Sequence, residues 1–358
     1  MAKTILPFGP QHPVLPEPIH LKLTIEDEIV TEAIPALGYV HRGLERLIEI
    51  KDFHQMIQVV ERICGICSMI HAMIYCQSIE ELMKLEVPQR AKYLRVVWSE
   101  LHRLHSHLLW LGLFADGLGF ESLFMELWKI REKVLDIDEA TTGNRIIVSV
   151  NVVGGVRRDL SPEQVRWIQS ELREMEDALK RLQNVIFNDY TVKKRTVGKG
   201  VLSRAQALEL GAAGPTLRGS GVAQDMRQLK YAAFDTIPFE PVVEPEGDSY
   251  ARMKVRFRES LQSIELVRQA LSSLPEGELA VKCKGKPEGE ITTRIEQPRG
   301  ELLYYIKAKG EKNLERLRIR TPTFANIPAL AVMLPGIELA DVPVVVLSID
   351  PCISCTER

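Results

Sequence analysis

The sequence predicts an α+β fold with a mainly helical core and small β-sheets near its N- and C-terminal regions. Apolar residues recur at helical spacing through the long middle of the chain. Residues 19–31 and 290–309 instead alternate between apolar and polar side chains, as half-buried strands do. A chain of 358 residues is also long enough to bury a sizeable core, as one large domain or two ordinary ones.

The first elements follow from these periodicities. Residues 19–31 reverse their alternation at Glu26-Asp27, which predicts a β-hairpin. Residues 51–73 have helical spacing that is interrupted by a pair of cysteines. A long helix is expected from Pro88 onward, because proline is favoured at a helix start and the apolar period of 3.6 then continues for six turns.

Further helices are expected at residues 120–135, 161–187 and 250–273. The second of these has the strongest start signal, because Ser161 can cap it and Pro162 fits its first turn. The segment 191–221 contains glycines and short polar turns, and it is expected to be rich in loops.

Strands return near the end of the chain. Residues 290–309 predict a strand pair, with Gly300 as a turn or bulge. The β-branched run 342–347 predicts a buried strand that leads directly into Asp350-Pro351-Cys352.

Composition excludes several classes of protein. The net charge of −2 provides no field that would favour nucleic acid. The longest apolar stretch, residues 108–114, is far shorter than the roughly 20 residues that cross a bilayer. The N-terminus lacks the long apolar run of a signal peptide. We therefore expect a soluble, cytoplasmic chain that can dock onto membrane partners.

Four of the six cysteines form two C-x-x-C pairs, Cys64/Cys67 and Cys352/Cys355. This spacing lets both sulfurs of a pair ligate one metal ion. The two pairs lie nearly the whole chain apart, whereas zinc ribbons use local pairs, and neither pair lies in the βαβ setting of a redox dithiol. Soft thiolates suit zinc, an iron–sulfur cluster and nickel alike, so ligand type alone does not choose the metal. Cys76 and Cys283 have no partner at ligand spacing and are interpreted as ordinary thiols.

The residues around the cysteines resemble the two signature motifs of nickel–iron hydrogenase large subunits. These are Glu61-Arg62-Ile63-Cys64-Gly65-Ile66-Cys67 with His71, and Asp350-Pro351-Cys352-Ile353-Ser354-Cys355. Three further segments resemble that family in the same order along the chain. They are His41-Arg42-Gly43-Leu44-Glu45, Pro298-Arg299-Gly300 and Thr321-Pro322-Thr323.

The opening Phe8-Gly9-Pro10-Gln11-His12-Pro13 narrows the resemblance to the group 4 membrane-bound, energy-converting (Ech-type) hydrogenases and the quinone-site 49 kDa subunit of complex I. Complex I subunits lack the four cysteines, which favours the hydrogenase branch. The resemblance implies one domain over 1–358, with a β-rich part at 1–50, a helical core at 51–275 and a C-terminal part at 276–358 that closes the metal site.

By the family pattern, all four thiolates bind nickel, and Cys67 and Cys355 also bridge to an iron that carries cyanide and carbon monoxide. The resemblance further implies roles for residues around the centre. Arg299 of the Pro298-Arg299 turn would lie over the open metal position, and Thr323 would border the iron. Glu17 would pass protons, although a solvated loop carboxylate is its alternative. Asp350 would pair with Arg299 or brace the cysteine turn.

Other assignments have strong structural alternatives. His71 could donate to a cysteine sulfur or be an ordinary buried histidine. His102, His105 and His107 could line a proton path or face a polar interface. Glu45 resembles the ligand of a second metal, usually magnesium. The best-known soluble and uptake members of the family end in a histidine that helps to bind this metal, however, and this chain has Arg358, which cannot ligate a cation. Ser106 likewise stands where many relatives have an aspartate.

The resemblance implies a hydrogen-activating subunit of an energy-converting complex on the cytoplasmic face of the cell membrane. Its partners would be an iron–sulfur small subunit, further hydrophilic subunits with iron–sulfur clusters, integral membrane ion-translocating subunits and ferredoxin, with no nucleic acid. The alternatives are a carbon-monoxide-linked hydrogenase of the same group, a quinone-reducing subunit of a complex I-like enzyme, and a scaffold subunit with a four-thiolate zinc.

Overall fold

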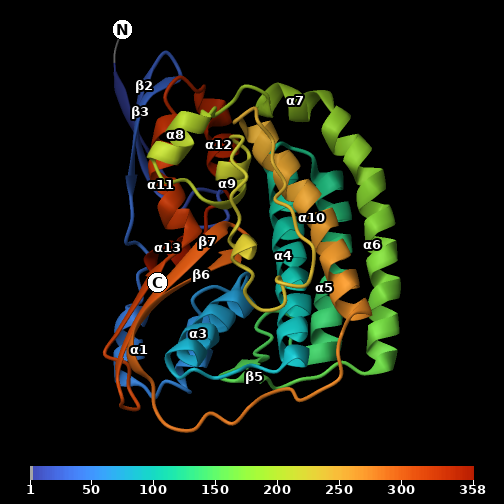
Figure 1. Ribbon diagram of the computed structural model, residues 1–358. Coiled ribbons are helices and arrows are strands. Elements are labelled where there is room, and N and C mark those ends of the chain that lie inside the picture. Colours follow the sequence, from blue (N-terminus) through green and yellow to red (C-terminus); the bar gives the residue numbers. More distant parts are fainter. Residues whose placement is uncertain (1–2) are drawn as a thin grey trace.

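The centre of the protein is a bundle of four long helices, seen in a computed structural model that describes residues 3–358 (Figure 1). The helices pack in a closed ring: α4 against α5, α5 against α6, α6 against α10, and α10 against α4. Their bounds are Gln89–Gly117 for α4, Glu121–Thr142 for α5, Pro162–Asn188 for α6 and Ser249–Ser272 for α10. All four were expected from the apolar period, and α5 extends seven residues beyond the predicted end.

The start of α6 shows why the sequence signal was strong. The Ser161 hydroxyl accepts from the backbone N–H of Gln164, and the Gln164 side chain accepts from the backbone N–H of Ser161. This capping box satisfies two donors that have no partner within the helix.

Two three-stranded antiparallel sheets lie on the other side of the molecule from α6 (Figure 1). The N-terminal sheet contains β1, β2 and β3 in that order, and the second sheet contains β6, β7 and β8. A two-stranded pair, β4–β5, was not expected. The strand bounds are Thr4–Phe8, His20–Glu26, Ile29–Ala36, Asn151–Val152, Gly155–Val156, Glu288–Gln297, Gly300–Lys309 and Arg316–Arg320 for β1 to β8.

The hairpin between β6 and β7 is tight, because Gln297 pairs with Gly300 and only Pro298 and Arg299 form the turn. Gly300 has a φ of 129°, and an added Cβ there would lie 2.6 Å from the backbone nitrogen of Gly214. Glycine is therefore required at this position by both conformation and space.

Shorter helices complete the fold. They are α1 (Leu44–Ile50), α2 (Met56–Glu61), α3 (Ser68–Leu82), α7 (Tyr190–Thr196), α8 (Arg204–Glu209), α9 (Gly214–Arg218), α11 (Pro322–Met333), α12 (Val342–Ser348), α13 (Ile353–Glu357) and the 3₁₀ turns η1 (Met226–Leu229) and η2 (Leu339–Asp341). The cysteine pair interrupts the helical stretch between α2 and α3, as the sequence predicted.

Two sequence predictions were wrong. The run 342–347 is not a strand but helix α12, which packs against α4 and α10 and is buried over most of its length. A short apolar run buried on all sides has no diagnostic period, and Pro343 fits the first turn of a helix. The segment 191–221 is not only loops, since it contains α7, α8 and α9, each five to seven residues long.

The N-terminal sheet contacts the C-terminal region of the chain. The backbone N–H of Val30 donates to the carbonyl of Ile337, and that of Leu339 donates to the carbonyl of Glu28. A second apolar cluster packs the N-terminal sheet against α11 and α12. This contact brings the C-terminal cysteine pair to the same side of the molecule as the N-terminal segment. Across residues 3–358, no helix combines the length and the apolarity needed to span a bilayer.

Replacing Ser161 by Ala is expected to lower the free energy of unfolding by about 1 kcal/mol, because the N-cap hydrogen bond to Gln164 is lost. Ser161→Asp is the matched control and should retain most of the stability, since aspartate also caps. Urea denaturation of the two variants measures the difference, and equal stability of Ser161→Ala and the parent would contradict the role of the cap.

Candidate metal centre

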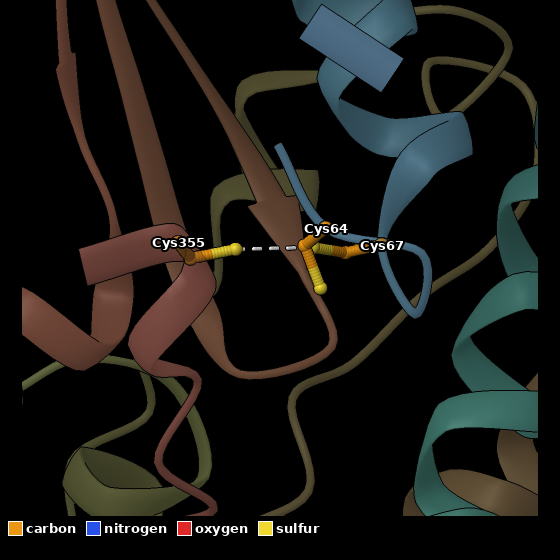
Figure 2. Close-up of side chains that lie close together, drawn as sticks. All are labelled: Cys64, Cys67 and Cys355. Atoms are coloured by element: carbon orange, nitrogen blue, oxygen red, sulfur yellow. Dashed lines mark hydrogen bonds between the residues drawn. The ribbon is translucent and has the colours of Figure 1, made fainter. Parts of the chain in front are cut away.

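The two cysteine pairs converge on one buried site. Cys64 and Cys67 lie in the turn between α2 and α3, while Cys352 caps α13 and Cys355 lies inside it. The Sγ atoms are 3.4 Å apart between Cys64 and Cys352, and 3.4 Å apart between Cys67 and Cys355. Figure 2 shows the side chains of Cys67 and Cys355 directed toward each other, with Cys64 beside them. Over residues 3–358, these three form the one group of three potential ligands whose atoms all lie within 4.8 Å of one another.

Backbone hydrogen bonds fix both cysteine turns. The carbonyl of Cys67 accepts from the N–H groups of Ile70 and His71, which starts α3 at the second cysteine of the first pair. The N–H of Cys355 points at the sulfur of Cys352, 3.4 Å away. The N–H of Cys352 donates to the hydroxyl of Thr323 at 3.1 Å, so Thr323 positions the second pair.

Arg42 ties the two pairs together. Its guanidinium donates to the carbonyls of Arg62 and Ile63, just before the first pair, and to the carbonyl of Ser354 inside the second. One planar side chain with several donors can bridge two turns in this way. Arg42 lies in the segment 41–45, in which the family resemblance singled out Glu45 as a metal ligand. The bridging role of Arg42 was not predicted.

The charges at the site favour a bound cation. Hydrogen bonds from Cys352, Cys355 and Cys67 lower the pKa of the Cys64 thiol well below its usual range. Burial raises the pKa values of Cys67 and Cys355. One thiol in the pocket therefore loses its proton readily. Loss of further protons is unfavourable unless a metal cation offsets the negative charge. Four convergent sulfurs from deprotonatable thiols fit a thiolate-ligated metal centre.

Arg299 and Asp350 lie beside the sulfurs as a buried ion pair. The Nε of Arg299 is 3.0 Å from Oδ1 of Asp350 and also donates to its carbonyl. Burial acts to lower the pKa of Arg299, but the charges of Asp350, Cys352 and Cys64 together raise it well above its usual range. The guanidinium is thus a fixed positive charge next to the cysteines, held by the Pro298-Arg299 turn.

Glu17 connects the cysteines with the surface. One carboxylate oxygen accepts from the backbone N–H groups of Ile353 and Ser354, the latter at 3.0 Å. Burial, and then the charge of Cys64, raise the pKa of Glu17 above its usual value. The same residue lines a groove of about 380 Å³ formed by residues 10–13 and 15–18. A carboxyl group at this position can take a proton from the cysteine side and release it to the groove.

His71 contacts Cys355 and is neutral. Its Nε2 lies 3.4 Å from Sγ of Cys355, and its Nδ1 lies 2.7 Å from the hydroxyl of Tyr304. Burial lowers the pKa of His71 to about 4. A neutral ring satisfies both contacts when the tyrosine donates to Nδ1 and Nε2–H points at the sulfur.

The three histidines of α4 have different polar partners, although the rings of His102 and His105 contact each other. His107 Nε2 is 2.9 Å from Glu259, the Nδ1 of His105 accepts from Arg131, and His102 faces Asp138 at 4.0 Å. All three rings are buried, and burial lowers their pKa values. His107 therefore belongs to an ion-pair network and not to the cysteine pocket.

The surroundings of Glu45 do not fit a magnesium ion. Its carboxylate already accepts from Arg318 at 2.6 Å, from the N–H of Ile319 at 2.9 Å and from Arg358 at 3.0 Å. Magnesium needs an octahedron of oxygen ligands, and two guanidinium groups repel it. The observed partners of Glu45 therefore do not fit its interpretation as a ligand of a second metal. The guanidinium of Arg358 supplies the positive charge at this place.

A buried network of ion pairs was not expected from the sequence. It links α4, α9, η1, α10 and β6, elements that are far apart along the chain. Its members are Glu100, Arg103, Arg218, Asp225, Arg227, Glu259 and Glu296. Charged residues usually indicate a solvated surface, so nothing in the local pattern marked these as buried.

Two known protein families match most of the chain from residue 42 onward. The family of the respiratory-chain NADH dehydrogenase 49 kDa subunit matches residues 117–286 and 279–358, and the nickel-dependent hydrogenase family matches residues 42–114. The carbon monoxide-induced hydrogenase of Rhodospirillum rubrum is 39% identical over the full length of both chains. The chain belongs to the family of group 4 nickel–iron hydrogenase large subunits and complex I 49 kDa subunits.

Two further relatives show how this family is used elsewhere. The membrane-bound hydrogenase subunit alpha of Pyrococcus furiosus is 38% identical, over 99% of this chain and 87% of its own length. A solved structure of the membrane-bound sulfane sulfur reductase, an archaeal respiratory membrane complex, contains a chain that matches with a TM-score of 0.95 and 32% identity. That match covers 99% of this chain and 98% of the other. Family membership thus establishes the fold and shows that the chain belongs to a family of oxidoreductases.

Replacing Cys355 by Ser should remove most of the bound metal, because the hydroxyl is a poor ligand for a soft cation and the other three sulfurs cannot close the site. Metal per protein is measured by elemental analysis. The control is Cys76→Ala, a buried cysteine outside both pairs, which should keep the full metal content. Retention of metal by Cys355→Ser would contradict the site.

Removal of magnesium by a chelator should leave the stability unchanged, because Arg358 and Arg318 already neutralise Glu45. Arg358→Ala should lower the free energy of unfolding by about 1.5–3 kcal/mol, the range for hydrogen bonds to charged groups. Arg316→Ala, which removes a more exposed pair with Glu49, should cost less than about 1 kcal/mol. Unfolding curves with and without chelator test this, and a large loss of stability on chelation would contradict it.

Proposed function

We propose that the chain is the hydrogen-activating subunit of an energy-converting complex and catalyses the reversible conversion of hydrogen into two protons and two electrons. The observation that carries the proposal is the convergence of four buried cysteines beside the Arg299–Asp350 pair and the partly buried Glu17. This set combines a soft-metal pocket, a fixed cation and an acid that reaches the surface.

Cys64, Cys67, Cys352 and Cys355 would hold nickel, with Cys67 and Cys355 shared with an iron that carries cyanide and carbon monoxide. When bound, this group supplies the redox-active metal that binds and splits hydrogen. Arg299 provides positive charge beside it, and Asp350 keeps that guanidinium in one orientation. His71 fixes the lone pairs of the Cys355 sulfur through its Nε2–H.

Glu17 is the proton carrier in this proposal. A proton released on the cysteine side is accepted by a Glu17 carboxylate oxygen, and the groove at residues 10–18 then takes it to solvent. The raised pKa of Glu17 suits this exchange, because a carboxyl with an ordinary pKa would stay ionised at neutral pH and would hold a proton too rarely.

The electrons must leave through partners. The four cysteines of the two pairs are needed as ligands, so we propose an adjacent small subunit with an iron–sulfur cluster. Further hydrophilic iron–sulfur subunits, ferredoxin and integral membrane ion-translocating subunits would complete an assembly on the cytoplasmic face of the membrane. Two similar proteins support such an assembly, because both are described as parts of membrane-bound enzymes. One is the membrane-bound hydrogenase of P. furiosus, and the other is the sulfane sulfur reductase complex.

A second candidate function is a reductase for sulfane sulfur or quinone. Two similarities favour it: the sulfane sulfur reductase structure, and a 36% identical subunit of the NADH-quinone oxidoreductase of Dehalococcoides mccartyi. The four cysteines favour hydrogen activation instead.

Elemental analysis and infrared spectroscopy of the purified complex decide between these functions. Hydrogen activation requires nickel and iron together, with infrared bands from iron-bound cyanide and carbon monoxide. Zinc alone would indicate a structural site, and the absence of metal would indicate the second candidate function.

Glu17→Gln should lower hydrogen evolution by about 10²-fold, the effect typical of losing a general acid, while nickel and iron content stay unchanged. The amide accepts the same backbone hydrogen bonds but cannot carry a proton. Glu32→Gln, which changes an exposed glutamate of β3 in the N-terminal sheet, serves as the control and should leave the rate unchanged. A fully active Glu17→Gln variant would remove Glu17 from the mechanism.

A further inference from the structure

A chain of buried charges leads away from the cysteine site. Asp350, which pairs with Arg299, also faces Arg256 at 4.0 Å. Glu259 lies one turn beyond Arg256 on α10 and pairs with Nε of Arg218 at 2.8 Å. Nη1 of the same Arg218 pairs with Glu296 at 2.8 Å. None of these side chains is more than 6% exposed, so water does not screen their charges.

The buried carboxylates of this network differ in how many positively charged groups they pair with. Asp225 pairs with both Arg218 and Arg227, and Glu100 lies between Arg227 and Arg103. Glu259 pairs with Arg218 and accepts from His107.

Glu296 has one guanidinium partner, Arg218, and one backbone donor, the N–H of Met226 at 2.9 Å. Burial, and then the charge of Asp225, raise the pKa of Glu296 to about 7. The pKa values of Glu100, Asp225 and Glu259 are instead lowered by their arginines, although burial opposes this. Glu296 thus differs from these three acidic groups, because its pKa is raised whereas theirs are lowered.

A cavity of about 120 Å³ gives Glu296 a route to solvent. Glu296, Gln224, Glu301 and Arg320 line it together with apolar residues of α8 and α9. Leu208 at its rim is 52% exposed, so the cavity approaches the surface there. The cavity is polar and large enough for several water molecules.

The cavity and the cysteine site lie on either side of the same hairpin turn. Gly214 lines the cavity, and an added Cβ there would lie 2.3 Å from the carbonyl oxygen of Arg299. The end of β6 thus carries Glu296 toward the ion-pair network and, three residues later, Arg299 toward the cysteines. Glu296 and the Arg299–Asp350 pair beside the cysteines are thus joined by this turn and by the buried charges of Arg256, Glu259 and Arg218. Charges interact strongly through such a buried network because the local dielectric constant is low.

We propose that Glu296 takes up one proton from the cavity when an iron–sulfur donor adds an electron to the cysteine-bound centre, and that it releases the proton when the electron leaves. The inference rests on the proposed function, because it needs a redox-active centre. The proton comes from an acid in the solvent, hydronium or buffer, and is relayed through water in the cavity. One O–H bond breaks in that acid, one forms at a carboxylate oxygen of Glu296, and the added electron stays on the cysteine-bound centre. Added negative charge favours the neutral acid, so reduction drives uptake and oxidation drives release.

The groups that face Glu296 set the sign of this response. Arg218 from α9 and Arg103 from α4 favour its ionised form, whereas Asp225 opposes ionisation. Across the cavity, Glu301 of β7 is paired with Arg320 of β8 at 3.5 Å, so these two charges largely cancel. The hydroxyl of Tyr231 accepts from the backbone N–H of Glu296 and does not touch its carboxyl group.

Infrared difference spectra of the purified complex, reduced minus oxidised at pH 7, test the proposal. Reduction should add the C=O stretching band of a protonated carboxylic acid in the parent. The band should be lost in Glu296→Gln and retained in Glu301→Gln, a carboxylate in the same cavity. Glu296→Asp should restore a band at a shifted frequency. This variant shows that the band is lost in Glu296→Gln because the carboxyl group is missing and not because the variant is misfolded.

A band that persists unchanged in Glu296→Gln, or that disappears in Glu301→Gln, would overturn the assignment to Glu296. The cyanide and carbon monoxide bands in the same spectra report the proposed function separately. Their presence without a Glu296 band overturns only this inference, whereas their absence overturns both.

Discussion

The rest of the structure depends on the mutual repulsion of four sulfur atoms that must lose their protons in a buried pocket. A thiolate in a low-dielectric interior is unstable unless positive charge lies close to it. The protein meets part of this need with Arg299, held by Asp350, and leaves the remainder to bound metal. The pKa values of the thiols show the same repulsion. The pKa of Cys64 is lowered, so this thiol loses its proton readily, whereas the pKa values of Cys67 and Cys355 are raised.

The same constraint explains why the ends of the chain are locked together. The first cysteine pair precedes α3, and the second lies in α13 at the C-terminus, so their sulfurs meet only if α13 is held in place. Arg42 and Glu17 bind the backbone of α13 from one side, and Arg358 reaches Glu45 on the other. The Arg358–Glu45 ion pair is therefore part of the contacts that hold α13 in place.

Sequence patterns predicted the parts of the fold that depend on local physics. The apolar period and the Ser161 cap located α4, α6 and α10, and Gly300 marked the turn of the β6–β7 hairpin, because helix amphipathicity and turn conformation are local properties. The resemblance around the cysteines predicted which sulfurs would meet, and the structure brings all four together. Helix α12 was predicted as a strand, since its valines favour strands locally whereas its burial between α4 and α10 is decided by tertiary packing. Arg218 and Glu296 could not be predicted as a buried pair, because the residues that compensate them come from distant segments.

The central claim is that this chain's own residues surround a metal centre that splits hydrogen and exchange its protons with solvent. Isotope exchange tests this most directly, because it needs no electron-transfer partner. We predict that the purified complex, supplied with deuterium gas in ordinary water and without an electron acceptor, forms HD. A complex that contains nickel and iron in full but forms no HD would contradict the claim.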